Sequence, residues 1–208
     1  MPRTGLGRDA RKAPSAMRER LIEAGVEVLL EEGFLGASAR AIAQRAGTAT
    51  GSIHYYFDST EDLLLAALDR TVGERREEYR RITAEASDPQ ALMGAISEAV
   101  AKDRASGRVR LLAQLMATAT TGGPLAAAVA DQTAQWSDLT AATIERIAGP
   151  RPLGIIDARD AATALTALFI GLELLDHVDP DRFDSVRLLE VFGPLAQLLS
   201  NLIPADTP

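Results

Sequence analysis

The chain contains no cysteine among its 208 residues, which excludes disulfide bonds, thiolate zinc sites and thiol chemistry. It also lacks a glycine-rich phosphate loop and a His-x-x-x-His pair, and two histidines leave no candidate Ser-His-Asp set. Its longest apolar stretches, such as Ala161 to Leu175, are interrupted by Thr, Gly and Glu before the ~18 residues that a membrane span needs. We therefore expect a protein that is not an enzyme and has no membrane partner.

The two histidines give little support for a metal site. His54 has no carboxylate or second histidine at ligand spacing. His177 has Glu173 four residues before it and Asp176 beside it, which imitates half of a metal site. We prefer to interpret it as a helix-end residue, stabilised by the negative end of the helix dipole. The sequence thus predicts no catalytic residue, no metal and no cofactor.

The N-terminal stretch is basic and has no apolar run behind it, so we expect no signal peptide and a cytoplasmic location. Residues 1–14 are rich in Arg and Gly and show no periodicity, which predicts a disordered arm. Such arms enter the minor groove of DNA in other helix-turn-helix proteins, but a frayed end without function fits these residues equally well.

Charge is divided unevenly along the chain, whose net charge is −7. Residues 1–60 hold 8 Lys+Arg and 7 Asp+Glu, whereas the remainder holds 14 and 22. One face of the first helix carries a stripe of glutamates: Glu19, Glu23, Glu27 and Glu31. We interpret this stripe as a solvated face that leaves Arg40 and Arg45 free to approach phosphates.

Residues 38–57 have the spacing of a helix-turn-helix. Ser38 is a plausible N-cap for a helix that Gly47 ends, because glycine accepts a left-handed backbone without steric cost. A second helix is expected from Thr48–Thr50 to Tyr56, with Ile53 and Phe57 facing inward. Short hydroxyls, a glycine, an imidazole and phenols remain on its outer side, and such groups reach base edges and phosphates from the major groove.

The same region resembles the TetR family of transcriptional regulators. Four segments match in order: Glu31 to Phe34 at the end of the first helix, Ile42 to Gly47 in the two-helix motif, Gly51 to Phe57 in the recognition helix, and Ser59 to Leu64 at the next helix start. The predicted DNA-binding residues are Ser38, Arg40, Thr48, Thr50, Gly51, Ser52, His54, Tyr55, Tyr56 and Thr60.

Two positions depart from the family pattern, which usually has tyrosine at position 54 and lysine at position 60. His54 and Thr60 stand there. Loss of the lysine removes one phosphate contact per subunit, about one unit of salt slope. The Thr60 hydroxyl still has access to a phosphate, aided by the positive end of the helix that Ser59 is expected to cap.

Beyond residue 60 the sequence predicts helices separated by turn signals and no strands, so the fold class is all-α with about nine helices. We divide the chain into the basic arm, a three-helix DNA-binding domain over 15–60 and a helical ligand-binding and dimerisation domain over 61–208. Helices are expected near 60–84, 89–104, 108–120, 125–147, 158–177 and 185–202.

The last two helices are apolar enough to form a dimer surface, although Pro194 should kink or shorten the final one. The resemblance implies that two such helices from each subunit build a four-helix bundle. The residues predicted at the homodimer interface are Leu165, Leu168, Leu172, Leu188, Phe192, Leu195 and Leu199.

The resemblance also implies that a small molecule enters the helical domain and spreads the two DNA-binding domains. Residues predicted to line its pocket are Met93, Leu112, Leu115, Met116, Trp136, Phe169 and Glu173, with Gln114 and Gln132 as further polar candidates; each fits an ordinary core position as well. Aromatics make up 4% of the chain, which favours an aliphatic or mixed effector.

The resemblance implies a ligand-responsive regulator, a repressor rather than an activator, that binds double-stranded DNA at a palindromic operator as a homodimer. The alternative is a helical ligand- or protein-binding module whose DNA reader is vestigial, which His54 and Thr60 leave open. Salt-dependent binding to a palindrome separates the two.

Overall fold

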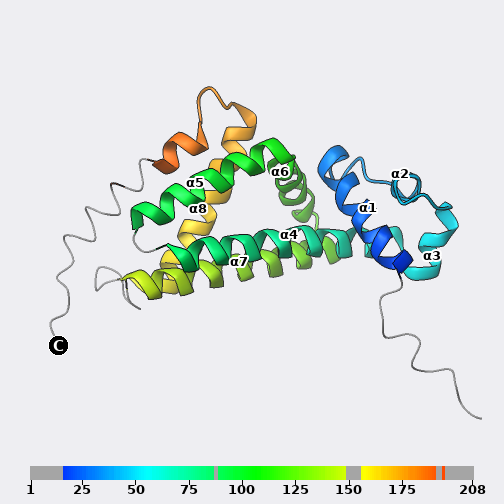
Figure 1. The fold of residues 1–208 in the computed structure, drawn as a ribbon, viewed down its shortest axis with the longest axis horizontal. Helices are drawn as coiled ribbons and strands as arrows, with labels where there is room; N and C mark the ends of the chain where they lie inside the picture. Colours follow the sequence, from blue (N-terminus) through cyan, green and yellow to red (C-terminus); the bar gives the residue numbers. More distant parts are fainter. Residues whose placement is uncertain (1–15, 87–88, 149–155, 191–193, 195–208) are drawn as a thin grey trace, which may run out of the picture. The chain divides into compact units, whose positions relative to one another are not determined.

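The computed structural model describes residues 16–86, 89–148, 156–190 and 194. Every regular element within these ranges is a helix, which confirms the predicted all-α class (Figure 1). The chain forms two compact units that divide between Arg70 and Thr71, inside one long helix. The predicted domain boundary at residue 60 stays a prediction.

The first unit contains α1 (Ala16–Glu32), α2 (Ala39–Arg45), the 3-10 turn η1 (Thr50–Ser52), α3 (Ile53–Tyr56) and the start of α4 (Thr60–Glu85). Its core consists of aliphatic side chains that recur three or four residues apart on α1 and α4, with one or two from each shorter helix. These buried residues are Leu21, Ile22, Val28, Leu29, Ile42, Ile53, Leu63, Leu64 and Leu68. Apolar side chains on one face of each helix therefore bind the short α2 and α3 to the two longer helices.

The second unit contains the remainder of α4 and four further helices: α5 (Pro89–Ser106), α6 (Arg108–Ala119), α7 (Pro124–Ala148) and α8 (Ala158–Val178). Residues 185–190 are also helical, as predicted, while most of the expected helix 185–202 lies outside the described residues. Pro89 and Pro124 stand at first helical positions, where their missing N–H costs no hydrogen bond. Gly107 separates α5 from α6 with a φ of 81°.

Helices α4 and α7 lie side by side and run in the same direction (Figure 1). Arg76 donates to Gln132 over 2.7 Å, and Arg146 donates to the backbone carbonyl of Thr83. From the first pair to the second the residue numbers rise on both helices, as they do only when two helices are parallel. Helix α8 runs antiparallel to α7, since Ser137 meets Thr163 at 3.1 Å and Asp138 meets Arg159 at 3.8 Å.

Several apolar side chains of helix α8 are exposed in the part of the chain that the structure describes. Leu165 is 46% exposed and Leu168 is 51% exposed, although the composition of α8 predicts packing on two sides. By length and composition α8 is also apolar enough to cross a membrane. The interpretation that no segment reaches a span is therefore wrong, because isolated Thr, Gly and Glu do not lower the average hydropathy enough. The same composition is found in helices that a partner protein covers.

Candidate nucleic-acid interface

The turn between α2 and α3 has the predicted geometry. The Ser38 hydroxyl accepts a hydrogen bond from the amide of Ala41 at 3.2 Å, which confirms its N-cap role. Gly47 has a φ of 63°, in the left-handed region that glycine enters at no steric cost. Arg20 of α1 donates to the carbonyl of Ala46 over 2.5 Å. This bond satisfies a helix-end carbonyl and fixes the turn against α1.

The recognition helix, residues 50–56, begins with the 3-10 turn η1 and continues as α3. We expected one helix that starts near Thr48–Thr50. The amide of Ser52 instead bonds the carbonyl of Ala49 at 2.9 Å, an i to i+3 contact that tightens the first turn. Ile53 and Phe57 are buried, as predicted, so they orient the outer face of this helix.

That outer face is open to solvent. Thr50, Gly51, His54 and Tyr55 are exposed, and Tyr55 reaches 82%. The rings of Tyr55 and Tyr56 meet edge to face with their centroids 4.8 Å apart. Such an exposed aromatic and polar surface has the chemistry to contact base edges and phosphates.

The hydroxyls of Thr48 and Ser52 are less free than the sequence suggested. They lie 2.8 Å apart, both half-buried, and hydrogen-bond to each other. Either hydroxyl can contact DNA only through the donor or acceptor sites that its bond to the other hydroxyl leaves open.

The start of α4 provides a further polar position. Ser59 accepts from the amide of Asp62 at 3.0 Å, which confirms the predicted cap, and Thr60 begins the helix half-exposed. Ser38 and Arg40 are exposed at the start of α2. Residues from the starts of α2 and α4 thus join the recognition helix in one unit.

Arg45 is a correction to the sequence analysis. It donates to Glu27 over 2.9 Å and to Glu31 over 3.0 Å, and this pairing lowers the pKa of Glu31 through the side-chain hydrogen bond. Glu19 similarly accepts from Arg70 at 2.7 Å. The glutamate stripe is therefore not only a solvated face, and Arg45 is not free for phosphates. Packing of α1 against α2 brings these charges together, which linear spacing does not reveal.

In the second unit the structure brings two of the predicted pocket residues together around Tyr79. The ring of Tyr79 on α4 meets Trp136 of α7 at 5.0 Å and Phe169 of α8 at 6.4 Å between centroids. Glu173 lies four residues, about one helix turn, after Phe169 and is only 7% exposed. Leu115 is buried, and the other predicted residues are half-buried: Met93, Leu112, Met116, Gln114 and Gln132.

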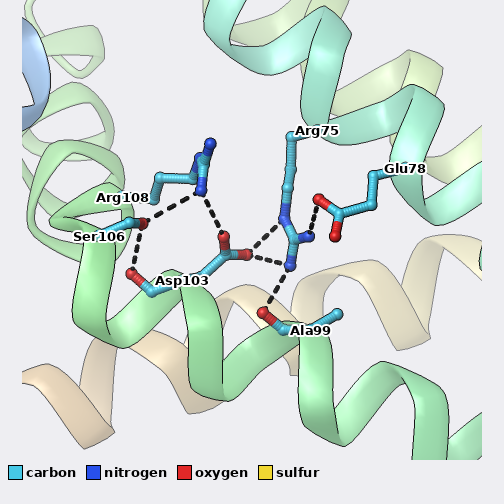
Figure 2. Close-up of polar contacts among 6 residues, drawn as sticks. All are labelled: Arg75, Glu78, Ala99, Asp103, Ser106 and Arg108. Carbon is cyan, nitrogen blue, oxygen red and sulfur yellow. Dashed lines mark hydrogen bonds and ion pairs between the residues drawn. The ribbon is translucent and has the colours of Figure 1, made fainter. Parts of the chain in front are cut away.

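A buried ionic network lies beside this aromatic cluster (Figure 2). Arg75 donates to Asp103 over 2.6 Å, to Glu78 over 2.8 Å and to the carbonyl of Ala99 over 2.8 Å. Its guanidinium carbon lies 4.2 Å from the centre of the Tyr79 ring. Burial raises the pKa of Asp103 against the opposing effect of Arg75.

Arg75 and Tyr79 were not predicted as site residues from the sequence. They lie four residues apart, about one helix turn, on the same face of α4. That spacing was the available signal.

A cavity of about 270 Å³ lies elsewhere in the second unit. Its lining residues are Arg104, Gly107, Val109, Arg110, Asp176, His177 and Pro180. Asp176 in its wall is satisfied by Arg104 at 3.0 Å and by the amide of Ser185 at 3.1 Å. The predicted pocket residues do not line this cavity, and their contact with an effector stays a prediction.

The predicted dimer residues fall into two groups. Leu165, Leu168 and Leu188 are exposed and Leu172 is half-buried, so they are available to a partner. Phe192, Leu195 and Leu199 lie outside the described residues.

Fold and site together define a class of protein: a helix-turn-helix unit joined through a long helix to a second helical unit. Residues 21–67 match the family described as bacterial regulatory proteins, tetR family. This match confirms, over residues 21–67, the resemblance to the TetR family found in the sequence.

Curated relatives agree over the N-terminal part. The chain is 36% identical over 85 residues to the fatty acid metabolism regulator protein of Bacillus subtilis, covering 39% of this chain and 43% of the relative. It is 34% identical over 83 residues to the HTH-type transcriptional repressor KstR of Mycolicibacterium smegmatis, covering 40% and 37%. The chain thus spans less than half the length of these two relatives.

Similarity of fold extends further. The crystal structure of reduced E. coli NemR has a TM-score of 0.71 with 19% identity, covering 85% of this chain and 94% of that one. At this identity the likeness concerns the fold alone.

Proposed function

We propose that the protein is a transcriptional repressor that binds a palindromic operator as a homodimer and is released by a small molecule. The observation that carries this proposal is the exposed face of the recognition helix, held by the buried Ile53 and Phe57 and by the turn at Gly47. A surface of this kind, presented by a helix-turn-helix, fits the major groove. We place its action in the cytoplasm.

The proposal assigns base and phosphate contacts to the exposed side chains of the recognition helix and to the starts of α2 and α4. Arg40 and Thr60 supply phosphate contacts, while Arg45 supports α2 through its glutamate partners. The relatives named as a regulator and as a repressor support regulation and its negative sign.

Dimerisation follows from the uncovered side of α8. Leu165 and Leu168 expose apolar surface to water. Burying such surface against a partner is favourable by roughly 25 cal/mol per Å². We propose that a second copy of this chain, and not a membrane, covers it. Two recognition helices related by a twofold axis then read an inverted repeat.

Selection of random duplexes against the purified full chain at two salt concentrations tests the proposal. We expect enrichment of an inverted repeat whose affinity falls steeply with salt, because phosphate contacts release counterions. Weak enrichment without symmetry would instead favour a helical binding module with a vestigial reader.

A further inference from the structure

Six side-chain polar atoms in the second unit are buried without a hydrogen-bond partner among the described residues, and three of them lie near the aromatic cluster of Tyr79. These three are the Tyr79 hydroxyl of α4 and, on α8, Glu173 Oε1 and Thr166 Oγ1. Thr166 and Glu173 stand two helical turns apart, so they share one face of α8, and Phe169 between them contacts the Tyr79 ring. Buried polar groups are nearly always hydrogen-bonded, so these atoms indicate a site where a ligand with polar groups can bind.

No basic side chain among the described residues forms an ion pair with Glu173. Its neighbour Arg75 uses Nε and both terminal nitrogens on Asp103, Glu78 and the Ala99 carbonyl (Figure 2). The other nearby carboxylate on α8, Asp176, is paired with Arg104. An ionised Glu173 therefore adds a negative charge that no ion pair among the described residues offsets.

Burial, followed by the charge of Asp103, raises the pKa of Glu173 to about 8, while Arg75 opposes the shift. In the same way burial raises the pKa of Tyr79, and the charge of Glu173 adds to this rise. The raised pKa of Glu173 agrees with the geometry, in which its buried Oε1 has no hydrogen-bond partner among the described residues.

The walls of this place are aromatic. Trp136, Tyr79 and Phe169 meet edge to face, and both Trp136 and Phe169 are only partly covered. Aromatic faces attract cations as well as apolar bodies. An ammonium group beside Glu173 would neutralise its charge. An apolar body attached to that group would cover the exposed parts of the aromatic rings.

We propose that the effector is an organic amine that carries its charge as a protonated N–H group, which donates to Glu173 while its apolar body lies against Trp136 and Phe169. Tyr79 and Thr166 supply further hydrogen bonds to it. This inference rests on the proposed ligand-responsive function and names the class of ligand.

The test measures binding of octylamine and phenylbutylamine to the full chain by calorimetry, each beside the alcohol and the carboxylate of the same carbon frame. We expect at least one amine to bind about tenfold more tightly than its alcohol and its carboxylate, the size of one charge-assisted hydrogen bond. In Glu173→Gln this preference is expected to vanish, and in the matched control Glu145→Gln, an exposed position on α7, it is expected to persist.

Proton exchange provides a second readout. The titratable or charged groups around Glu173 are Arg75, Glu78 and Tyr79 on α4, Asp103 on α5 and Asp176 on α8. An ammonium ion that binds at pH 7 displaces the proton of Glu173. Amine affinity should therefore rise between pH 6 and pH 8 in the native chain and stay level in Glu173→Gln.

Tyr79→Phe and Thr166→Val complete the design, since each removes one hydroxyl and keeps the shape. Both are expected to weaken amine and alcohol alike and to retain the preference for the amine. The proposal is overturned if neither amine binds, if alcohol or carboxylate binds equally well, or if Glu173→Gln keeps the preference. Operator binding is measured on the same protein without amine, so that a protein that binds DNA but no amine refutes this inference and leaves the proposed function intact.

Discussion

At the scale of single residues, Tyr55 is a side chain that packs little against the folded chain and is available to a partner. Its ring is 82% exposed, so truncation removes little buried surface from the folded chain. Its only described ring contact is with Tyr56. A residue of this kind affects stability little and an interface strongly.

We therefore predict that Tyr55→Ala weakens binding to the selected operator by about 1–3 kcal/mol, the range of one direct contact with DNA. Fluorescence anisotropy with a labelled duplex measures this loss. The dimer and its melting temperature are expected to remain as in the native chain. Unchanged affinity in Tyr55→Ala and in Ser52→Ala would place the recognition surface elsewhere.

Glu173 gives the opposite case, a charged residue whose burial affects stability. Its ordinary pKa is 4.5, and burial raises the pKa to about 8 in the folded chain. Between these values the folded chain holds a proton that the unfolded chain has lost. Raising the pH through this window therefore lowers the free energy of unfolding, by at most about 1.4 kcal/mol per pH unit.

Glu173→Gln removes this dependence. We predict that the free energy of unfolding of the variant exceeds that of the native chain by an amount that grows by about 1–3 kcal/mol from pH 5.5 to pH 8. Urea denaturation at one fixed protein concentration measures both chains. Parallel pH curves would show that Glu173 is not buried as an acid.

At the scale of helices and turns, local rules account for the helix-turn-helix. Ser38, Gly47 and Ser59 were predicted correctly because caps and turns depend on residues within four positions of each other. The pairing of Arg45 with Glu27 and Glu31 was not, because it depends on how two helices pack. The contact of Arg75 with Asp103 escaped prediction for the same reason, since 28 positions separate them.

The turn at Gly47 permits a sharp test. A Cβ at this position meets only the end of Arg20, at 3.4 Å, so the cost of Gly47→Ala comes from its φ of 63°. We predict a loss of about 1–2 kcal/mol in the free energy of unfolding. Gly51→Ala is the matched control, because its Cβ meets nothing within 4 Å and its φ is not in the left-handed region. Equal stability of the two variants would contradict the role of the turn.

Helix α8 is the element whose exposed side most needs a partner. We predict that Leu168→Glu weakens the dimer at least about 100-fold, because a carboxylate placed in an apolar interface loses its water. Sedimentation over a range of protein concentrations measures the change. Ala117→Glu, at an exposed position on α6, should leave the dimer intact. A dimer unaffected by Leu168→Glu would mean that another surface joins the subunits.

At the scale of the whole molecule, charge and symmetry support one account. The first 60 residues are close to neutral in net charge while the remainder is strongly acidic, so the field of the protein directs its N-terminal part toward DNA. The fold class and the helix-turn-helix were predictable because helical periodicity and turn residues repeat along the sequence. The buried site around Glu173 was not predictable, because it is formed by three helices that are distant in the sequence.

The most direct test of the central claim compares two duplexes: the selected inverted repeat and the same duplex with one half-site scrambled. A homodimer that reads both halves predicts that scrambling weakens binding at least about 100-fold at physiological salt, because one reader then lacks its specific contacts. It also predicts two chains on each intact duplex. Equal affinity for the two duplexes, or one chain on the intact repeat, would contradict the account.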